Sequence, residues 1–500
     1  MKRIFFLFSL TALTIVSCKK VEDVPIEPAL AAGPDQIVYA ITATNDLIKF
    51  NANDPLITQS KTAITGIAAG EKLLSIDFRP ATGELYGLSN ASKLYIINQA
   101  DGKSRVVGAA AFTPAISGTI ASIDFNPTVD RIRLVTNTGQ NLRLNPETGM
   151  VAATDMAING GSSPAITGIA YTNSKAGTPM TTLYDIDQTS GKLYIQNPPN
   201  NGALVEVGSL GITFTGNAAF DIAASNNSAL FSANNNFYSI DLATGKANKI
   251  GFSYESFVDI AIPTDAVAYA TDINNNLLIF NPNTINSTGA ILKPITGLQA
   301  GENIFGIDFR PLNGQLYALG STSRLYSINL SNAAATQVGT GTFGTALSGT
   351  DFGFDFNPTV DRIRVVSNAG QNLRLNPIDG TVAAVDAAIN PGTPMLSSAA
   401  YTNNFAGTTS TTLLVLDHNT DKLYTQIPPN NGTLIEVGNL GINIGNNNGF
   451  DISSRTNTAY LIATVGGTNN IYTVNITTGA ATNPIAFPSA IKGFSIGIGF

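Results

Sequence analysis

The sequence predicts an all-β protein made of two tandem five-bladed β-propellers, with four strands in each blade. Three features support this prediction: a long internal duplication, a finer repeat inside each copy, and short strand-like runs inside each finer repeat. The duplication matches residues 38–263 to residues 268–500. Its best-preserved segment, Asp124–Arg133, recurs unchanged as Asp355–Arg364.

The duplicated segment has the alternation of an antiparallel sheet. Residues 131–134 (RIRL) and 140–146 (QNLRLNP) each alternate polar with apolar side chains, which is the period of a strand. Between them, residues 137–139 (NTG) offer a short turn in which glycine can adopt positive φ. The two runs should therefore pair as a hairpin that sets Arg133 opposite Arg143.

Each copy also contains five units of about 46 residues. A unit begins with an apolar triplet whose centre is often aspartate, as in residues 76–78 (IDF). Strand-like runs follow at residues 85–88, 94–97 and 104–107 in the same unit. Four short strands in each unit are typical of a propeller blade.

The ends of the copies predict how the rings close. The first copy begins at residues 38–41, which match a second strand, and ends at residues 257–262, which match a first strand. The second copy should end in the same way at Phe494–Phe500. A last strand that completes the first blade would remove the open sheet edges. We therefore expect propeller repeats at 37–263 and 264–500.

A single ring of ten blades is the alternative architecture. Only residues 263–265 separate the copies, and this length also suits a hairpin within one blade. Two rings are favoured because five blades lie within the usual range of about four to eight.

The N-terminus predicts export and lipid attachment. Residues 1–17 have two basic residues and then an apolar run that is too short for a comfortable membrane span. The run ends in a small residue before Cys18, which is typical of a bacterial lipoprotein signal; an ordinary secretory signal is the alternative. Residues 18–36 then form a proline-containing tether. The expected location is the cell envelope, at the outer membrane, facing the periplasm or the outside.

The longest motif carries a resemblance to a known family. Asp-Phe-Asn-Pro-x-x-Asp-Arg-Ile-Arg, beginning at residues 124 and 355, is followed by Gly-Gln-Asn-Leu-Arg-Leu-Asn-Pro. This pattern resembles the bacterial domain-of-unknown-function family 4394, and the resemblance covers both copies. It implies a propeller-like β fold and no assigned activity, so it brings no catalytic residues to this chain.

Composition argues against several classes of function. Charged residues make up 12% of the chain and the net charge is −7, so a nucleic-acid partner is not expected. His418 is the only histidine and is expected on the surface in a turn, and Cys18 is the only cysteine. A zinc site or a Ser-His-Asp triad is therefore not predicted. We expect no cofactor, no metal and no catalytic residue.

An aspartate recurs in the first strand of most units. If these carboxylates faced the ring axis, their oxygens could hold a cation. The simpler expectation is that each accepts hydrogen bonds between blades. The set is Asp77, Asp124, Asp221 and Asp259 in the first copy and Asp308, Asp355 and Asp451 in the second, where Ala400 and Gly497 are expected to interrupt it.

The duplicated hairpin gathers like charges on its polar face. Arginines directly opposite each other are destabilising unless compensated, and the preceding hairpin is expected to bring Asp124 beside Arg131. Two interpretations remain open: an inter-blade network that fixes the blade angle, or a polar cleft in each ring for an anionic or hydroxylated ligand. The residues are Asp124, Arg131, Arg133, Asn141, Arg143 and Asn145 in the first copy and Asp355, Arg362, Arg364, Asn372, Arg374 and Asn376 in the second.

These observations favour a non-enzymatic binding or scaffold role, with an unknown protein or glycan as the ligand. The alternative is a carboxylate- or cation-dependent hydrolase or lyase that acts on polysaccharide. Such enzymes need paired carboxylates across a cleft. The binding role is preferred because no spacing in the sequence selects such a pair.

Overall fold

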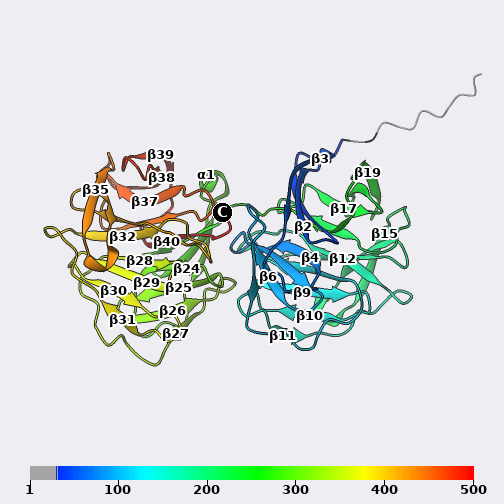
Figure 1. The fold of residues 1–500 in the computed structure, drawn as a ribbon, viewed down its shortest axis with the longest axis horizontal. Helices are drawn as coiled ribbons and strands as arrows, with labels where there is room; N and C mark the ends of the chain where they lie inside the picture. Colours follow the sequence, from blue (N-terminus) through cyan, green and yellow to red (C-terminus); the bar gives the residue numbers. More distant parts are fainter. Residues whose placement is uncertain (1–29, 31) are drawn as a thin grey trace, which may run out of the picture.

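The computed structural model describes residue 30 and residues 32–500, and the predicted signal peptide and Cys18 lie outside this part of the chain. Ten antiparallel sheets of four strands make up the described fold. They form two rings that lie side by side, with the C-terminus at their junction (Figure 1). No helix in the described residues is long and apolar enough to cross a membrane.

The first ring closes on itself. Its last strand, β20, pairs antiparallel with β1 at the start of the copy. Blade by blade, the strands are β20 (Phe257–Ala261), β1 (Ile37–Thr42), β2 (Asp46–Asn51) and β3 (Asp54–Ala63); β4 (Leu73–Phe78), β5 (Leu85–Ser89), β6 (Leu94–Ile97) and β7 (Ser104–Val107); β8 (Ala121–Asn126), β9 (Arg131–Thr136), β10 (Asn141–Leu144) and β11 (Val151–Thr154); β12 (Ile166–Tyr171), β13 (Leu183–Asp187), β14 (Lys192–Gln196) and β15 (Leu204–Ser209); and β16 (Ala219–Ile222), β17 (Ala229–Ala233), β18 (Asn236–Ile240) and β19 (Ala247–Phe252). A 3-10 turn, η1 (Pro199–Asn201), precedes β15.

The second ring repeats this closure through β40 and β21. Its strands are β40 (Ile491–Ile496), β21 (Ala268–Asp272), β22 (Asn276–Phe280) and β23 (Ile291–Pro294); β24 (Ile304–Arg310), β25 (Gln315–Gly320), β26 (Arg324–Ile328) and β27 (Ala335–Val338); β28 (Phe352–Asn357), β29 (Arg362–Ser367), β30 (Asn372–Leu375) and β31 (Val382–Val385); β32 (Leu396–Tyr401), β33 (Leu413–Asp417), β34 (Lys422–Gln426) and β35 (Leu434–Asn439); and β36 (Asn448–Ile452), β37 (Ala459–Val465), β38 (Thr468–Val474) and β39 (Ala481–Ala486). The short helix α1 (Ile285–Thr288) and the 3-10 turn η2 (Pro429–Asn431) complete it.

These pairings confirm two five-bladed propellers and exclude the ten-bladed ring, because each copy's last strand pairs with that copy's own first blade. Around each axis the innermost strands contact one another in order, and in the first ring β20 returns to β4. Apolar clusters fill the spaces between blades, so most strands are buried on both faces. That burial agrees with continuous apolar runs such as the LYII of β6.

The end of the chain differs from the prediction. The closing strand was expected at 494–500, but β40 spans Ile491–Ile496. The last residues leave the sheet because they bond to the first ring instead: the Gly499 amide donates to the Thr82 carbonyl (2.7 Å). At the same junction the Tyr269 hydroxyl donates to the Ala81 carbonyl (2.9 Å). The final residues therefore help to join the two rings.

Candidate functional site

The duplicated hairpin adopts the predicted register. In the first ring Leu134 lies opposite Leu142 and Arg133 opposite Arg143. The second ring repeats this arrangement, with Arg364 opposite Arg374. Two guanidinium groups therefore face the same side of each hairpin, and a negative charge is needed close by.

One carboxylate shared by both arginines supplies that charge. Arg133 Nη1 donates to Asp155 Oδ2 (2.6 Å), while Arg143 donates to both Asp155 oxygens (2.8 and 2.9 Å). Asp386 joins Arg364 and Arg374 with the same three distances. Burial opposes ionisation of Asp155, but the arginine hydrogen bonds outweigh it and hold its pKa below the usual range. The carboxylate therefore stays charged at neutral pH.

The inner arginine of each pair is almost fully buried and spans two blades. Arg364 is 2% exposed and donates to Asn372 Oδ1 on its own blade and to Asn430 Oδ1 on the next (2.7 Å each). Arg364 Nε also reaches the Tyr401 hydroxyl, at 3.5 Å. Asn372 in turn donates to the Pro429 carbonyl (3.0 Å), so the hairpin and the turn η2 are fastened together. These contacts support the inter-blade network.

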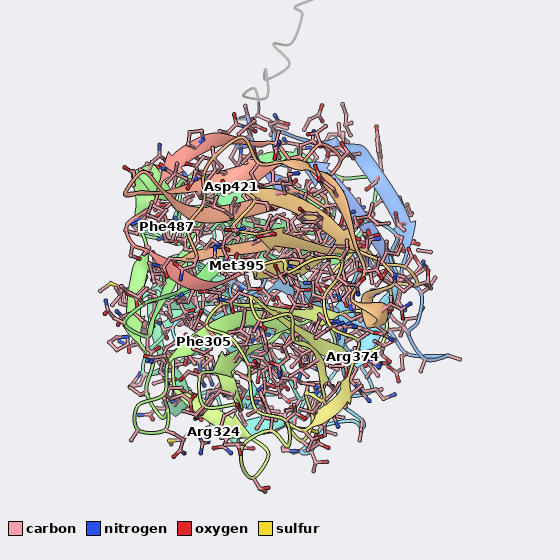
Figure 2. The ribbon with its side chains drawn as sticks, turned by 90° about the vertical axis from the view of Figure 1, so that its left-hand side faces the viewer. Phe305, Arg324, Arg374, Met395, Asp421 and Phe487 are labelled. Carbon is pink, nitrogen blue, oxygen red and sulfur yellow. The ribbon has the colours of Figure 1, made fainter. Side chains whose placement is uncertain are left out.

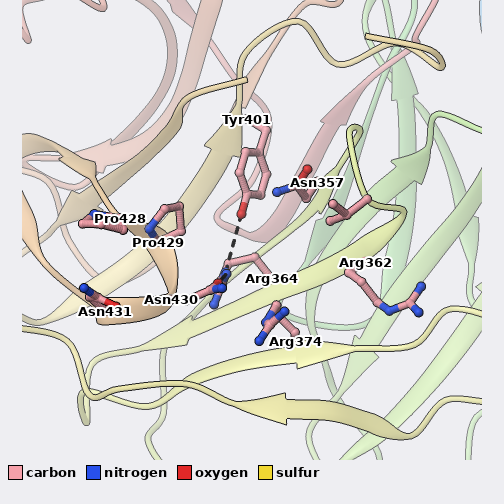
Figure 3. Close-up of a pocket in the computed structure, with 10 residues that line it drawn as sticks. Asn357, Arg362, Arg364, Arg374, Tyr401, Pro428, Pro429, Asn430 and Asn431 are labelled. Atoms are coloured by element: carbon pink, nitrogen blue, oxygen red, sulfur yellow. Dashed lines mark hydrogen bonds between the residues drawn. The ribbon is translucent and has the colours of Figure 1, made fainter. Parts of the chain in front are cut away.

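A cleft lies over this network in the second ring. It has a volume of about 340 Å³. Figure 3 shows Tyr401 above Arg364, the prolines of the η2 turn on one side and Arg362 on the other. Figure 2 shows the second ring from its side, with Arg374 and Met395 at separate places. We call this the second cleft; its lining is Asn357, Val360, Arg362, Arg364, Arg374, Tyr401, Pro428, Pro429, Asn430 and Asn431.

The first ring holds the same residue types at the same places in its repeat. We call this set of residues the first cleft because they correspond by the repeat to the lining of the second; they are Asn126, Val129, Arg131, Arg133, Arg143, Tyr171, Pro198, Pro199, Asn200 and Asn201. Arg133 there donates to Asn141 and to Asn200 at 2.8 and 2.7 Å. Arg133, Arg143 and Asn141, which were candidate residues in the sequence, are thus joined by hydrogen bonds in this network.

The predicted partner of the outer arginine was wrong. Asp124 lies opposite Arg133, and Asn126 lies opposite Arg131. The turn between β8 and β9 is longer than expected, because Asp130 takes a positive φ of 49° at its end. In the second ring Asp355 likewise lies opposite Arg364.

Arg131 and Arg362 each donate from Nη1 to a neighbouring backbone carbonyl (2.8 Å). Asn145 accepts hydrogen bonds from the amides of Glu147 and Thr148, and Asn376 accepts one from Ile378. These two asparagines thus shape the turn after β10 or β30. They are absent from the residues that line the second cleft.

Sequence reasoning missed the shared aspartates, the tyrosines and the asparagines of the proline turns. Asp155 and Asp386 were visible as repeated carboxylates, but nothing in their spacing linked them to the arginines. The repeated Pro-Pro-Asn-Asn-Gly segment, residues 198–202 and 428–432, was the available signal for the turn. Its glycine adopts φ near 66° at Gly432, where a side chain would strike the Ala388 carbonyl.

The recurrent aspartates face the axis of each ring. Oxygens of Asp77, Asp124 and Asp221 lie within 4.8 Å of one another, and the second ring repeats this cluster with Asp308, Asp355 and Asp451. Each carboxylate accepts backbone amide hydrogens. Those of Asp77, for example, come from Phe78 and from Phe125 on the next blade, at 2.7 and 2.6 Å. The predicted hydrogen bonds between blades are confirmed.

The second axial set is interrupted at a different residue from the one predicted. In the first ring Asp259 lies opposite Ile41. The equivalent place opposite Thr271 holds Gly493, whereas Gly497 lies beyond β40. Ala400, the other residue expected to interrupt the set, lies in β32, the first strand of its blade.

The axial carboxyl groups resist ionisation. Burial is the main cause, and it raises the pKa of Asp221 to about 7 and that of Asp259 to about 8. Burial and the neighbouring Asp221 raise the pKa of Asp77 well above its usual range. In the second ring burial raises the pKa of Asp451 to about 7.

His418 is more enclosed than predicted. Its side chain is 14% exposed, and Nε2 lies 3.9 Å from Asp351 Oδ2. Asp351 also pairs with Lys492 at 3.2 Å. The histidine follows β33 as expected, but Asp351, the residue before β28, lies close to it.

Comparisons with known proteins identify the family. The pattern of the family described as "Domain of unknown function (DUF4394)" matches residues 46–261 and 276–496. No curated protein matches the chain. Solved structures that match include the dihydro-heme d1 dehydrogenase NirN (9% identity, TM-score 0.25, 95% of this chain and 78% of that one). They also include PorZ, a surface component of the type-IX secretion system of Porphyromonas gingivalis (14%, 0.24, 89% and 65%).

The axial carboxyl groups predict an unusual dependence of stability on pH. An unfolded aspartate has a pKa of about 3.9, so between about pH 4 and pH 8 the folded protein binds more protons than the unfolded chain. Stability should therefore fall as pH rises through this window. Thermal unfolding in the presence of a chelator should give a lower Tm at pH 8 than at pH 5. Asp259→Asn should make this dependence shallower, and a Tm that rises steadily from pH 5 to pH 8 would contradict the assignment.

Proposed function

The chain is a tandem member of the DUF4394 family, and from that premise we propose that it is an exported, lipid-anchored protein that binds an anionic ligand in its arginine-lined clefts without transforming it. The propeller fold positions the cleft residues, and the charged side chains of the clefts would bind the ligand. The supporting observations come from the charge of the clefts, the donors that remain free in them, and the N-terminal sequence.

The excess of positive charge in the clefts is the observation that carries the proposal. Arg362, Arg364 and Arg374 line the second cleft, and the single carboxylate of Asp386 pairs with the last two of them. Neighbouring Asp361 is held by Arg310, which donates to both of its oxygens. The cleft therefore keeps two uncompensated positive charges. Partly buried charges of one sign favour a ligand of the opposite sign.

The free donors in the cleft also suit an oxyanion. Arg374 uses Nε and Nη2 for Asp386, which leaves Nη1 without a hydrogen bond to the described chain. Arg362 uses only Nη1, so the edge of its guanidinium group formed by Nε and Nη2 also has no hydrogen bond to the described chain. That edge of a guanidinium matches two oxygens of a carboxylate, sulfate or phosphate.

The geometry of the clefts gives little support to the alternative function, a hydrolase or lyase. A glycoside hydrolase needs a carboxyl group with a raised pKa as its general acid. Asp155 and Asp386 have lowered pKa values because two arginines hold each of them. The axial aspartates, whose pKa values are raised, bond to backbone amides. The pKa values of Glu84, Glu147 and Asp185 are raised as well, but the two glutamates pair with arginines and Asp185 is fully buried. None of these carboxyl groups lines the second cleft. A binding role is therefore favoured over hydrolysis.

We expect the purified protein to bind anionic ligands and to leave them unchanged. Isothermal titration against polygalacturonate and against a neutral glucan should give binding only for the acidic polymer. The affinity should drop between 50 and 500 mM salt, because salt screens partly exposed charges. Arg374→Gln should weaken binding, and Lys246→Gln, an exposed lysine outside the clefts, serves as the matched control.

Three outcomes would count against this proposal: equal binding of the neutral glucan, no binding of any anion, or loss that is as large in the control variant. Chromatography of the polymer after long incubation with Ca²⁺ adds a separate check. Shortened chains would favour the hydrolase or lyase.

Lipid attachment is tested at Cys18. The short apolar run and the small residue before this cysteine support cleavage and acylation there. In the producing bacterium, the Cys18→Ala protein should shift from the membrane pellet to the soluble fraction. Equal recovery of the variant and the unchanged protein in the pellet would contradict lipid anchoring.

A further inference from the structure

The two clefts share one core but differ in the acids around it. Both cores have the same arginine–aspartate distances. Glu147, beside the first cleft, lies 3.4 Å from Arg79 and within electrostatic reach of Arg131. The repeat places Ile378 at the equivalent position beside the second cleft, where it is exposed. The outer arginine of the second cleft therefore lacks this negative neighbour.

A second acid lies behind the first cleft. Asp185 on β13 is fully buried, and neither of its carboxylate oxygens has a hydrogen-bond partner among the described residues. It lies opposite Ile169 in the sheet and within electrostatic reach of Arg133. The equivalent residue in the second ring is Val415, which lies opposite Ala399. The second ring thus replaces both acids by apolar side chains.

These differences act in the same direction on a bound anion. In the first cleft, Glu147 offsets part of the charge of Arg131, and Asp185 opposes an anion near Arg133 whenever it ionises. In the second ring neither of these two positions carries an acid. Asp379, next to Ile378, is exposed and accepts hydrogen bonds from Thr381 instead. Electrostatic attraction is strongest where a site is partly enclosed and its charge is uncompensated.

We propose that the second cleft is the ligand site and that it selects a doubly negative oxyanion carried on a larger organic body, while the first cleft is mainly structural. The proposal rests on the proposed anion-binding function and assigns it to one of the two rings. Two excess charges match two negative charges on the ligand. The volume of about 340 Å³ exceeds the roughly 30 Å³ of one water molecule by far, so a bare oxyanion would not fill it.

The rim of the second cleft agrees with such a ligand. Val360 lines the cleft beside the charged residues and is 55% exposed. The two prolines of the η2 turn add apolar surface to the lining. A carbon skeleton attached to the oxyanion can cover these groups while the arginines hold the charge.

Three probes with one carbon framework test the assignment by titration of the full chain: glucose 6-phosphate, glucuronate and glucose. At low salt and pH 8 we expect one site per chain, tightest for glucose 6-phosphate, weaker for glucuronate and absent for glucose. Arg362→Gln should weaken glucose 6-phosphate binding about ten-fold or more, the order expected for a charged hydrogen bond. Arg131→Gln, the matched variant of the first ring, should change it less than about two-fold.

A conversion experiment adds a gain of function. Replacing the two acids of the first ring by their counterparts, Glu147→Ile with Asp185→Val, should create a second site for glucose 6-phosphate. Two equal sites in the unchanged protein, or equal losses from Arg131→Gln and Arg362→Gln, would overturn the assignment to the second ring and leave anion binding intact. Failure to bind any of the probes or an acidic polymer would overturn the proposed function itself. Binding that neither arginine variant weakens would place the site outside both clefts.

Discussion

The shared carboxylate between two cross-strand arginines is the interaction on which the described clefts depend. Repulsion between the guanidinium groups would open the hairpin, and Asp155 or Asp386 prevents this by accepting hydrogen bonds from both. One carboxylate cannot neutralise two arginines. The arrangement that stabilises the hairpin therefore also leaves positive charge at the surface, so the structural and the binding interpretations describe two consequences of one arrangement.

Closure of each ring makes this arrangement possible. Because β20 and β40 complete the first blade of their own copy, each hairpin is held against the turn of the next blade. Arg364 bridges these blades through Asn430. The axial aspartates fasten the innermost strands in a different way, by accepting backbone amide hydrogens across blades. Charge at the axis is suppressed by burial, whereas charge in the clefts is retained.

Local features of the sequence were sufficient for the blades and the hairpin register. Period-two alternation and the Gly139 turn determine which residues face each other, so Arg133 opposite Arg143 could be predicted. Contacts between distant segments could not: Arg133 and Asn200 are 67 residues apart, and no local pattern links them. The error at Asp124 came from one turn conformation, and the error at the C-terminus came from contacts with the other ring. The difference between the two clefts could not be predicted from the sequence alone, because the role of Asp185 depends on its burial, which only the structure shows.

The most direct measurement of this account is the thermal stability of Arg364→Ala compared with Arg374→Ala. Arg364 is 2% exposed, whereas the Arg374 side chain is 33% exposed, although both bind Asp386. Removing one partner of a buried pair costs roughly 3–5 kcal/mol, which for a ring of this size lowers Tm by about 10 °C. We predict such a loss for Arg364→Ala and a clearly smaller one for Arg374→Ala. An unchanged Tm for Arg364→Ala would contradict the claim that the shared carboxylate and its buried arginine hold the cleft together.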